Sequence, residues 1–168
     1  MATNKVYGLK AITMGAPAAD GGMGITLTEV LGATVKGTAS LTSTPPETEE
    51  IEIEETDELY DEIETKGAIW TLAGSTYNVS AITMQKFFGG TIANGIWSAP
   101  VGGATVQVYQ SVVAETRTGI KFNFVKMKLT GTANLGFDKS KLGQIDWTGK
   151  VLKADKVNTP AFTIDFGV

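Results

Sequence analysis

SAITMQKFFGGTIANGIWSAP, residues 80–100, contains the one helix that the pattern predicts in a chain otherwise made of strands. Ser80 suits a helix N-terminus, because its hydroxyl oxygen can accept a hydrogen bond from a free N–H group two or three residues later. Ala81, Met84 and Phe88 then fall at helical spacing on one apolar face, which Phe87 widens. Gly89 follows where a left-handed residue commonly ends a helix. We therefore expect a helix over residues 81–88 that packs on a sheet.

Most other segments alternate apolar and polar side chains with a period of two, which is typical of half-buried antiparallel strands. The apolar positions include Val35, Gly37, Ala39 and Leu41; Ala68, Trp70 and Leu72; Ile145, Trp147 and Val151; and Phe162, Ile164 and Phe166. Phe122 and Phe124 share one parity, but Val125 and Met127 continue on the other. A change of parity inside a strand predicts a β-bulge near residues 124–125.

These patterns predict a mainly β fold, a two-sheet antiparallel β-sandwich or barrel with one flanking helix. Aromatic side chains bury the most area per residue and are the expected core. They are Trp70, Phe87, Phe88, Phe122, Phe124, Trp147 and Phe162. A chain of 168 residues can bury roughly 70% of its unfolded surface in one core, so we expect a single domain over residues 1–168.

One segment is too acidic for a core. Eleven of the 18 acidic residues lie between residues 47 and 64, namely Glu47, Glu49, Glu50, Glu52, Glu54, Glu55, Asp57, Glu58, Asp61, Glu62 and Glu64. Apolar residues are interspersed among them, namely Ile51, Ile53, Leu59, Tyr60 and Ile63. We expect a long hairpin or extended loop over about residues 47–66, and insertions of this length are usually functional or disordered.

Composition excludes several classes of function. The chain has no cysteine and no histidine, which removes disulfides, Cys/His zinc sites and Ser–His or Cys–His catalytic pairs. The acidic residues run along an elongated element and lack the spacing of an EF-hand loop. No apolar run reaches the 18 residues of a membrane span, and the N-terminal apolar run is too short for a signal peptide. We expect no catalytic residues, no cofactor and no metal.

Charge is distributed unevenly along the chain. Residues 1–116 hold 5 basic and 14 acidic side chains, a balance of −9, whereas residues 117–168 hold 9 basic and 4 acidic, a balance of +5. Such polarity suits a protein that stacks head to tail on copies of itself, although solubility alone also produces it.

The order of motifs along the chain resembles that of the tail tube (major tail) proteins of long-tailed bacteriophages. The motifs are Tyr7-Gly8 before the glycine-rich turn Asp20-Gly21-Gly22, Pro45-Pro46 before the acidic extension, the helix before Gly89-Gly90-Thr91 and Trp97-Ser98-Ala99-Pro100, and a strand over residues 161–166. The resemblance implies hexameric rings that stack into a tube in the virion tail, after synthesis in the host bacterial cytoplasm. Such a tube contacts other tail proteins, conducts DNA without sequence-specific binding and catalyses nothing.

The resemblance also implies that the acidic extension contacts the neighbouring ring. The expected contact residues are Glu49, Glu52, Glu54, Asp57, Leu59, Tyr60 and Ile63. Two alternatives remain open at this point. One is the inner tube of a contractile injection or secretion system, which shares the fold. The other is a monomeric β-sandwich module that binds a carbohydrate or a protein, which would need an exposed aromatic platform.

Overall fold

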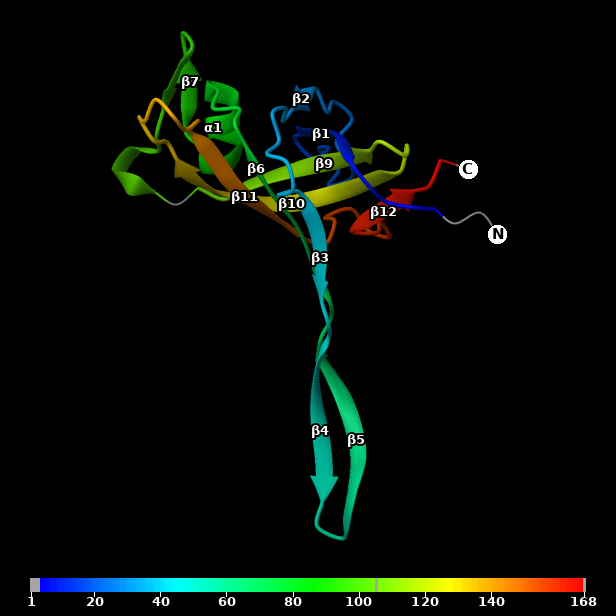
Figure 1. Cartoon of the computed structure of the whole chain (residues 1–168). Helices are drawn as coiled ribbons and strands as arrows, with labels where there is room; N and C mark the ends of the chain where they lie inside the picture. The colour runs from blue at the N-terminus through cyan, green and yellow to red at the C-terminus, as the bar shows by residue number, and fades with distance from the viewer. Residues whose placement is uncertain (1–3, 105, 168) are drawn as a thin grey trace.

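The structure is a computed structural model that describes residues 4–104 and 106–167, and it shows a β-rich body from which one long hairpin projects (Figure 1). The elements are β1 (Leu9–Gly15), β2 (Glu29–Val30), β3 (Ser40–Thr44), β4 (Glu47–Ile53), β5 (Thr56–Lys66), β6 (Ile69–Thr76), α1 (Ala81–Phe88), β7 (Thr91–Ala93), β8 (Ile96–Ser98), a 3-10 turn (Val101–Gly103), β9 (Val108–Thr116), β10 (Lys121–Asn134), β11 (Gln144–Val151) and β12 (Phe162–Asp165). The paired strands are antiparallel, which confirms the predicted β-sandwich-like class with one helix.

The layers of the body are parts of one hydrogen-bonded sheet. Its strand order is β2-β1-β9-β10-β11-β6-β3, and β12 also pairs with β10. The sheet curls around a core: Ile12 of β1 and Leu72 of β6 lie in one apolar cluster, although three strands lie between β1 and β6 in the sheet. After β2 the chain crosses to β6, where Thr34 bridges Thr76. Among the described strands the sheet does not close on itself.

A β-bulge divides β10 into two halves with different neighbours. Phe124 pairs with Val112 and Met127 with Gln110, so three residue steps along β10 lie opposite two residue steps along β9. Before the bulge β10 pairs with β12, and after it with β11. The predicted bulge near residues 124–125 is therefore confirmed.

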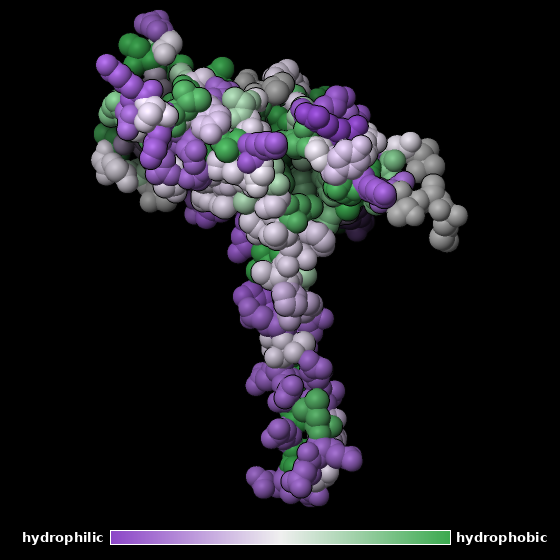
Figure 2. Space-filling view, in the orientation of Figure 1, coloured by the Kyte–Doolittle hydropathy of each residue, from purple (hydrophilic) through white to green (hydrophobic). Residues whose placement is uncertain are grey.

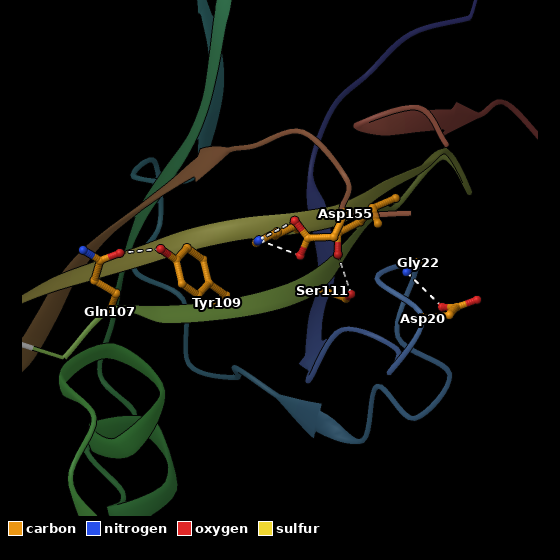
Figure 3. A network of polar contacts seen from close by, with 8 residues as sticks. Asp20, Gly22, Gln107, Tyr109, Ser111 and Asp155 are labelled. Atoms are coloured by element: carbon orange, nitrogen blue, oxygen red, sulfur yellow. Dashed lines mark hydrogen bonds and ion pairs between the residues drawn. The ribbon is translucent and has the colours of Figure 1, made fainter. Parts of the chain in front are cut away.

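Ser111 secures this bulge from the core side. Its side chain is fully buried, and its hydroxyl donates to the Val125 carbonyl oxygen at 2.6 Å (Figure 3). The same hydroxyl accepts from the Gly24 N–H at 2.9 Å. A bulge leaves a residue outside the regular ladder, and here a side chain supplies the missing hydrogen bond. The glycine-rich turn is thereby tied to the centre of the sheet.

The helix begins and ends where the sequence predicts. The Ser80 hydroxyl accepts from the Thr83 N–H at 3.2 Å, and Gly89 ends the helix with φ at 71° and ψ at −149°. That ψ lies outside the left-handed helical region, so the chain leaves in an extended direction. The apolar face is centred on Phe87, which is buried, whereas Met84 and Phe88 are half-buried against the core. The sequence pattern had centred this face on Met84 and Phe88.

Glycines in the inner face of the sheet make room for the largest side chains. Trp147 pairs with Gly131 on one side and Gly74 on the other. A Cβ at Gly131 would lie 2.9 Å from the Phe87 Cβ, and one at Gly74 would lie 3.2 Å from the Trp147 ring. Phe87 can therefore stack on Trp147, with ring centroids 5.7 Å apart. The stacked Phe87–Trp147 pair fits in the core because the positions beside Trp147 in the sheet are glycines.

The expected aromatic core divides in two. Phe87, Phe124 and Trp147 are buried, and Trp70, Phe88, Phe122 and Phe162 are half-buried. Phe162 of β12 lies 5.1 Å from Trp70 and 5.7 Å from Phe124 between ring centroids, so β12 covers the aromatic side chains at one end of the core.

The strand predicted from Val35 is wrong over its first half. Residues 36–38 form a turn, with Gly37 at φ 81° and the Thr38 N–H donating to the Val35 carbonyl oxygen at 3.2 Å. The Thr38 hydroxyl also accepts from the Ser75 N–H at 3.0 Å. Strand β3 begins only at Ser40, because the chain, which already meets β6 at Thr34, turns at residues 36–38 before it pairs with β6 again.

Candidate interaction surface

The acidic segment forms a hairpin that stands clear of the body (Figure 1), as the sequence predicts. Its strands, β4 and β5, continue from β3 and β6 through Pro45-Pro46 and Gly67-Ala68. Each arm holds about ten residues and therefore spans about 33 Å. At its base Lys66 forms an ion pair with Glu47 at 2.8 Å. Strand β5 is exposed along its whole length, so the hairpin is held mainly by its own backbone ladder.

The register of the hairpin separates its side chains onto two faces. Glu49 lies opposite Ile63, and Ile51 lies opposite Asp61. Directly opposed residues share a face, and alternation adds Leu59 to the same one. Leu59 and Ile63 are about half exposed, at 50% and 51%. Ile51, Leu59 and Ile63, which we call the apolar stripe, therefore meet solvent instead of a core.

The other face of the hairpin is strongly acidic. Glu50 lies directly opposite Glu62, and Thr48 lies opposite Glu64. Like charges in opposed positions repel, and among the described residues the hairpin holds one ion pair, at its base. Figure 2 shows the result, with hydrophobic residues gathered toward the tip and hydrophilic ones around them.

The structure divides the residues that we expected at a contact between rings. Glu49, Asp57, Leu59 and Ile63 lie on the face of the apolar stripe. Glu52 and Tyr60 point the other way, and Glu54 lies in the turn. A partner that covers the apolar stripe would therefore meet the first group directly.

A second surface lies on the sheet that carries the hairpin. The outward positions of β10, β11, β6 and β3 form three cross-strand rows, namely Thr132-Asp146-Ser75, Thr130-Thr148-Ala73-Ser40 and Lys128-Lys150-Thr71-Thr42. Seven of these eleven residues are threonine or serine, and we call this surface the hydroxyl face. The Thr130 and Thr148 hydroxyls lie 2.8 Å apart, which links neighbouring strands.

Asp146 is the one carboxylate in these rows. It accepts hydrogen bonds from the Ser75 hydroxyl, from Asn134 Nδ2 at 2.6 Å and from Gln144 Nε2 at 2.9 Å. The bond from Ser75, followed by those from Asn134 and Gln144, holds the pKa of Asp146 below its ordinary value against the opposing effect of desolvation. The carboxylate thus joins three strands and stays ionised at neutral pH.

The curled sheet leaves an opening between two strand edges. Strand β3 ends the strand order, and β2 covers β1 only at Thr13 and Met14. Between these edges lies an apolar groove of about 370 Å³. Its lining includes Leu9, Leu41, Leu72, Phe122 and Phe124. Free strand edges present unpaired N–H and C=O groups and readily pair with another chain.

The basic residues of the C-terminal third are not equivalent. Lys126 is engaged twice, in an ion pair with Asp155 at 2.7 Å and over the Tyr109 ring at 4.8 Å (Figure 3). Lys156 pairs with Asp20, and the hydrogen bond that it donates lowers the pKa of that carboxyl. Lys139 and Lys141 lie instead in the loop between β10 and β11, in no ion pair among the residues described.

Two of these surfaces were not predicted from the sequence, namely the hydroxyl face and the exposed loop between β10 and β11. The hydroxyl face rests on pairing between strands distant in the chain, which alternation within one segment does not reveal. The loop between β10 and β11 exposes Phe137 and Leu142 beside its lysines, and this mixture of apolar and basic residues is legible in the sequence.

Comparison with protein-family models and with curated proteins finds no match to this chain. None of the helices in the described ranges is long and apolar enough to cross a membrane. Within residues 4–104 and 106–167 no three acidic side chains are grouped so as to hold a metal ion.

Proposed function

We propose that this chain is the structural subunit of a phage tail tube, which assembles into hexameric rings that stack into a conduit for DNA. The observation that supports this most is the projecting hairpin. It carries a half-exposed apolar stripe and a dense set of carboxylates along arms about 33 Å long that stand clear of the body. Exposed apolar surface ringed by charge is typical of a protein–protein contact.

The partner that fits this hairpin is another copy of the chain. The hairpin concentrates negative charge, and residues 117–168 carry a balance of +5 on the body. Complementary charges steer association and set register, while buried apolar side chains supply most of the affinity. The resemblance to tail tube proteins, in which an extension contacts the next ring, agrees with this assignment.

Lateral assembly would use the open edges of the sheet. Pairing of the β3 edge with a neighbouring copy would satisfy its free backbone groups and cover the apolar groove beside Leu41. Repetition of such a heterologous contact forms a closed ring when the rotation between neighbouring copies brings the last copy back to the first. The number six comes from the resemblance.

The hydroxyl face would then border the lumen. Two of its four strands, β3 and β6, continue into the hairpin, so we place its rows around the axis along which the hairpin projects. Threonine and serine hydroxyls offer polar contact with few fixed charges, and Lys128 and Lys150 are its only cations. A surface of this kind hydrates a passing polyanion without the many cationic contacts that bind DNA tightly.

Negative-stain electron microscopy of the purified full chain, together with its mass by light scattering, tests this proposal. We expect rings with a central hole, stacks of such rings, and a ring mass six times the 17.7 kDa of one chain. Featureless particles of a single-chain mass at all concentrations would contradict the proposal and favour a monomeric binding module.

A further inference from the structure

The loop between β10 and β11, residues 135–143, presents apolar and basic side chains together. It lies on the side of the body away from the hairpin tip, at the upper left of Figure 1. Phe137 is fully exposed, at 102%, and Leu142 is exposed at 73%. Lys139 and Lys141 lie between them in the loop. We call this segment the basic loop.

The basic loop has a defined shape. Asp138 accepts hydrogen bonds from the backbone N–H and the hydroxyl of Ser140, both at 2.8 Å. These bonds, that of the backbone first, lower the pKa of Asp138, so its carboxylate keeps the turn at neutral pH. At the end of the loop, Leu135 packs against Gly143, where a Cβ would lie 3.2 Å from the Leu135 Cδ2. The phenylalanine and the lysines are thus displayed by an ordered turn.

The hairpin and the basic loop complement each other in two properties. The hairpin offers Leu59 and Ile63 among carboxylates, and the loop offers Phe137 and Leu142 among lysines. Each of these four side chains is at least half exposed on its own chain. Contact between them would remove both from water and place opposite charges around the junction.

The other lysines fit this role less well. Lys126 is already held by Asp155 and by the Tyr109 ring. Lys128 and Lys150 oppose each other on the hydroxyl face, with threonines and no exposed apolar side chain beside them. The basic loop instead places two lysines that form no ion pair among the described residues beside Phe137, which is fully exposed, and Leu142, which is 73% exposed.

We propose that the basic loop is the docking surface for the hairpin of a second copy of this chain, with the apolar stripe seated on Phe137 and Leu142. This inference rests on the proposed self-assembly and adds the surface that receives the hairpin. Because the two surfaces lie on different sides of one molecule, the contact is head to tail and repeats without limit.

Engineered cysteines test this docking without interference, because the natural chain has none. The variants Leu59→Cys and Phe137→Cys are mixed, assembled and oxidised, and the disulfide-linked dimer is measured on a non-reducing gel. A matched mixture pairs Leu59→Cys with Ile25→Cys, which replaces an apolar side chain on the body exposed at 93%. Disulfides form only where Cα atoms approach within about 7 Å.

We expect at least about tenfold more dimer from the first mixture, because docking holds the two thiols at a high effective concentration. Charge reversal gives an independent measurement. The variant Lys139→Glu/Lys141→Glu should lose stacked tubes and keep single rings, and Glu49→Lys/Asp61→Lys on the hairpin should restore stacking in the mixture.

The outcomes separate the docking from the function. Tubes that form without the Leu59–Phe137 cross-link, or that persist in the Lys139→Glu/Lys141→Glu variant, would overturn the docking surface and leave the tube proposal intact. A wild-type chain that never exceeds one chain mass would overturn both.

Discussion

At the scale of single residues, stability depends on a few large side chains fitted beside glycines. Phe87 is 4% exposed and stacks on Trp147 in the space left by Gly131. Phe88, its neighbour in the sequence, is half-buried and meets Trp97 edge-on at 6.5 Å between centroids. The two phenylalanines therefore form a matched pair with unequal burial.

Phe87→Ala should destabilise the chain by about 3–5 kcal/mol, which for a domain of this size lowers Tm by roughly 6–20 °C. Phe88→Ala should cost clearly less, because less apolar area is lost. Thermal melts of both variants, followed by circular dichroism, check this. Equal losses would show that the helix packs through the wider face that the sequence pattern indicated.

Asp146 gives a prediction in pH. Its folded-state pKa is depressed, mainly by the Ser75 hydroxyl, so its bonds contribute stability above the ordinary aspartate pKa of about 3.9 and lose it as pH falls through the lower folded value. Asp146→Asn should therefore be less stable than the wild type at pH 7, with the difference shrinking below about pH 4. Urea unfolding at both pH values measures this, and a difference that does not change with pH would contradict it.

At the scale of elements, much of the fold was legible in local sequence. The Ser80 cap, the parity change after Phe124 and the acidic hairpin each depend on residues close together in the chain, and each was confirmed. The small hairpin β7–β8 was missed although Asn94-Gly95 signals a tight turn; both residues adopt positive φ, 51° and 78°.

What local sequence did not show depends on distant partners. Val35 to Ala39 alternates like a strand, yet the chain turns there because Thr38 must reach Ser75 of β6. The hydroxyl face depends on four strands that the topology brings together. The apolar and basic residues at 137–142 can be identified as a docking candidate only when their position relative to the hairpin is known. Of the hairpin residues proposed from the sequence for an interface, Tyr60 and Glu52 turn away from the apolar stripe.

The hairpin can be removed as a unit. Replacing residues 48–65 by Asn-Gly joins Glu47 to Lys66, which already oppose each other in register. A two-residue turn of this type fits antiparallel strands. Since β5 buries nothing, we expect Tm to stay close to that of the wild type while stacking is lost. Microscopy and a melt of the same sample check both parts.

A full-length control keeps the hairpin and removes only its apolar character. Leu59→Ser/Ile63→Ser should retain the fold and weaken stacking as the shortened variant does. Tubes of normal length from either variant would show that the hairpin does not join rings.

At the scale of the whole molecule, the two kinds of contact should respond differently to salt. Raising the salt to about 0.5 M shortens the Debye length to about 4 Å, which screens exposed charge pairs but hardly affects buried backbone pairing. Tube growth, followed by light scattering, should slow because its charges steer association. The ring mass should stay constant, and dissociation of rings to single chains would mean that the lateral contact is electrostatic.

The hairpin and the basic loop occupy different sides of the same chain, and this gives any assembly built from them a direction. One end of the assembly would display unpaired hairpin carboxylates and the other end unpaired lysines of the basic loop, so the assembly would grow at different rates at its two ends. The same factor could not seal both ends of the assembly. A protein that starts the structure and one that stops it would have to carry opposite charge, and length would be set by these factors because every subunit added restores the surface that it covers.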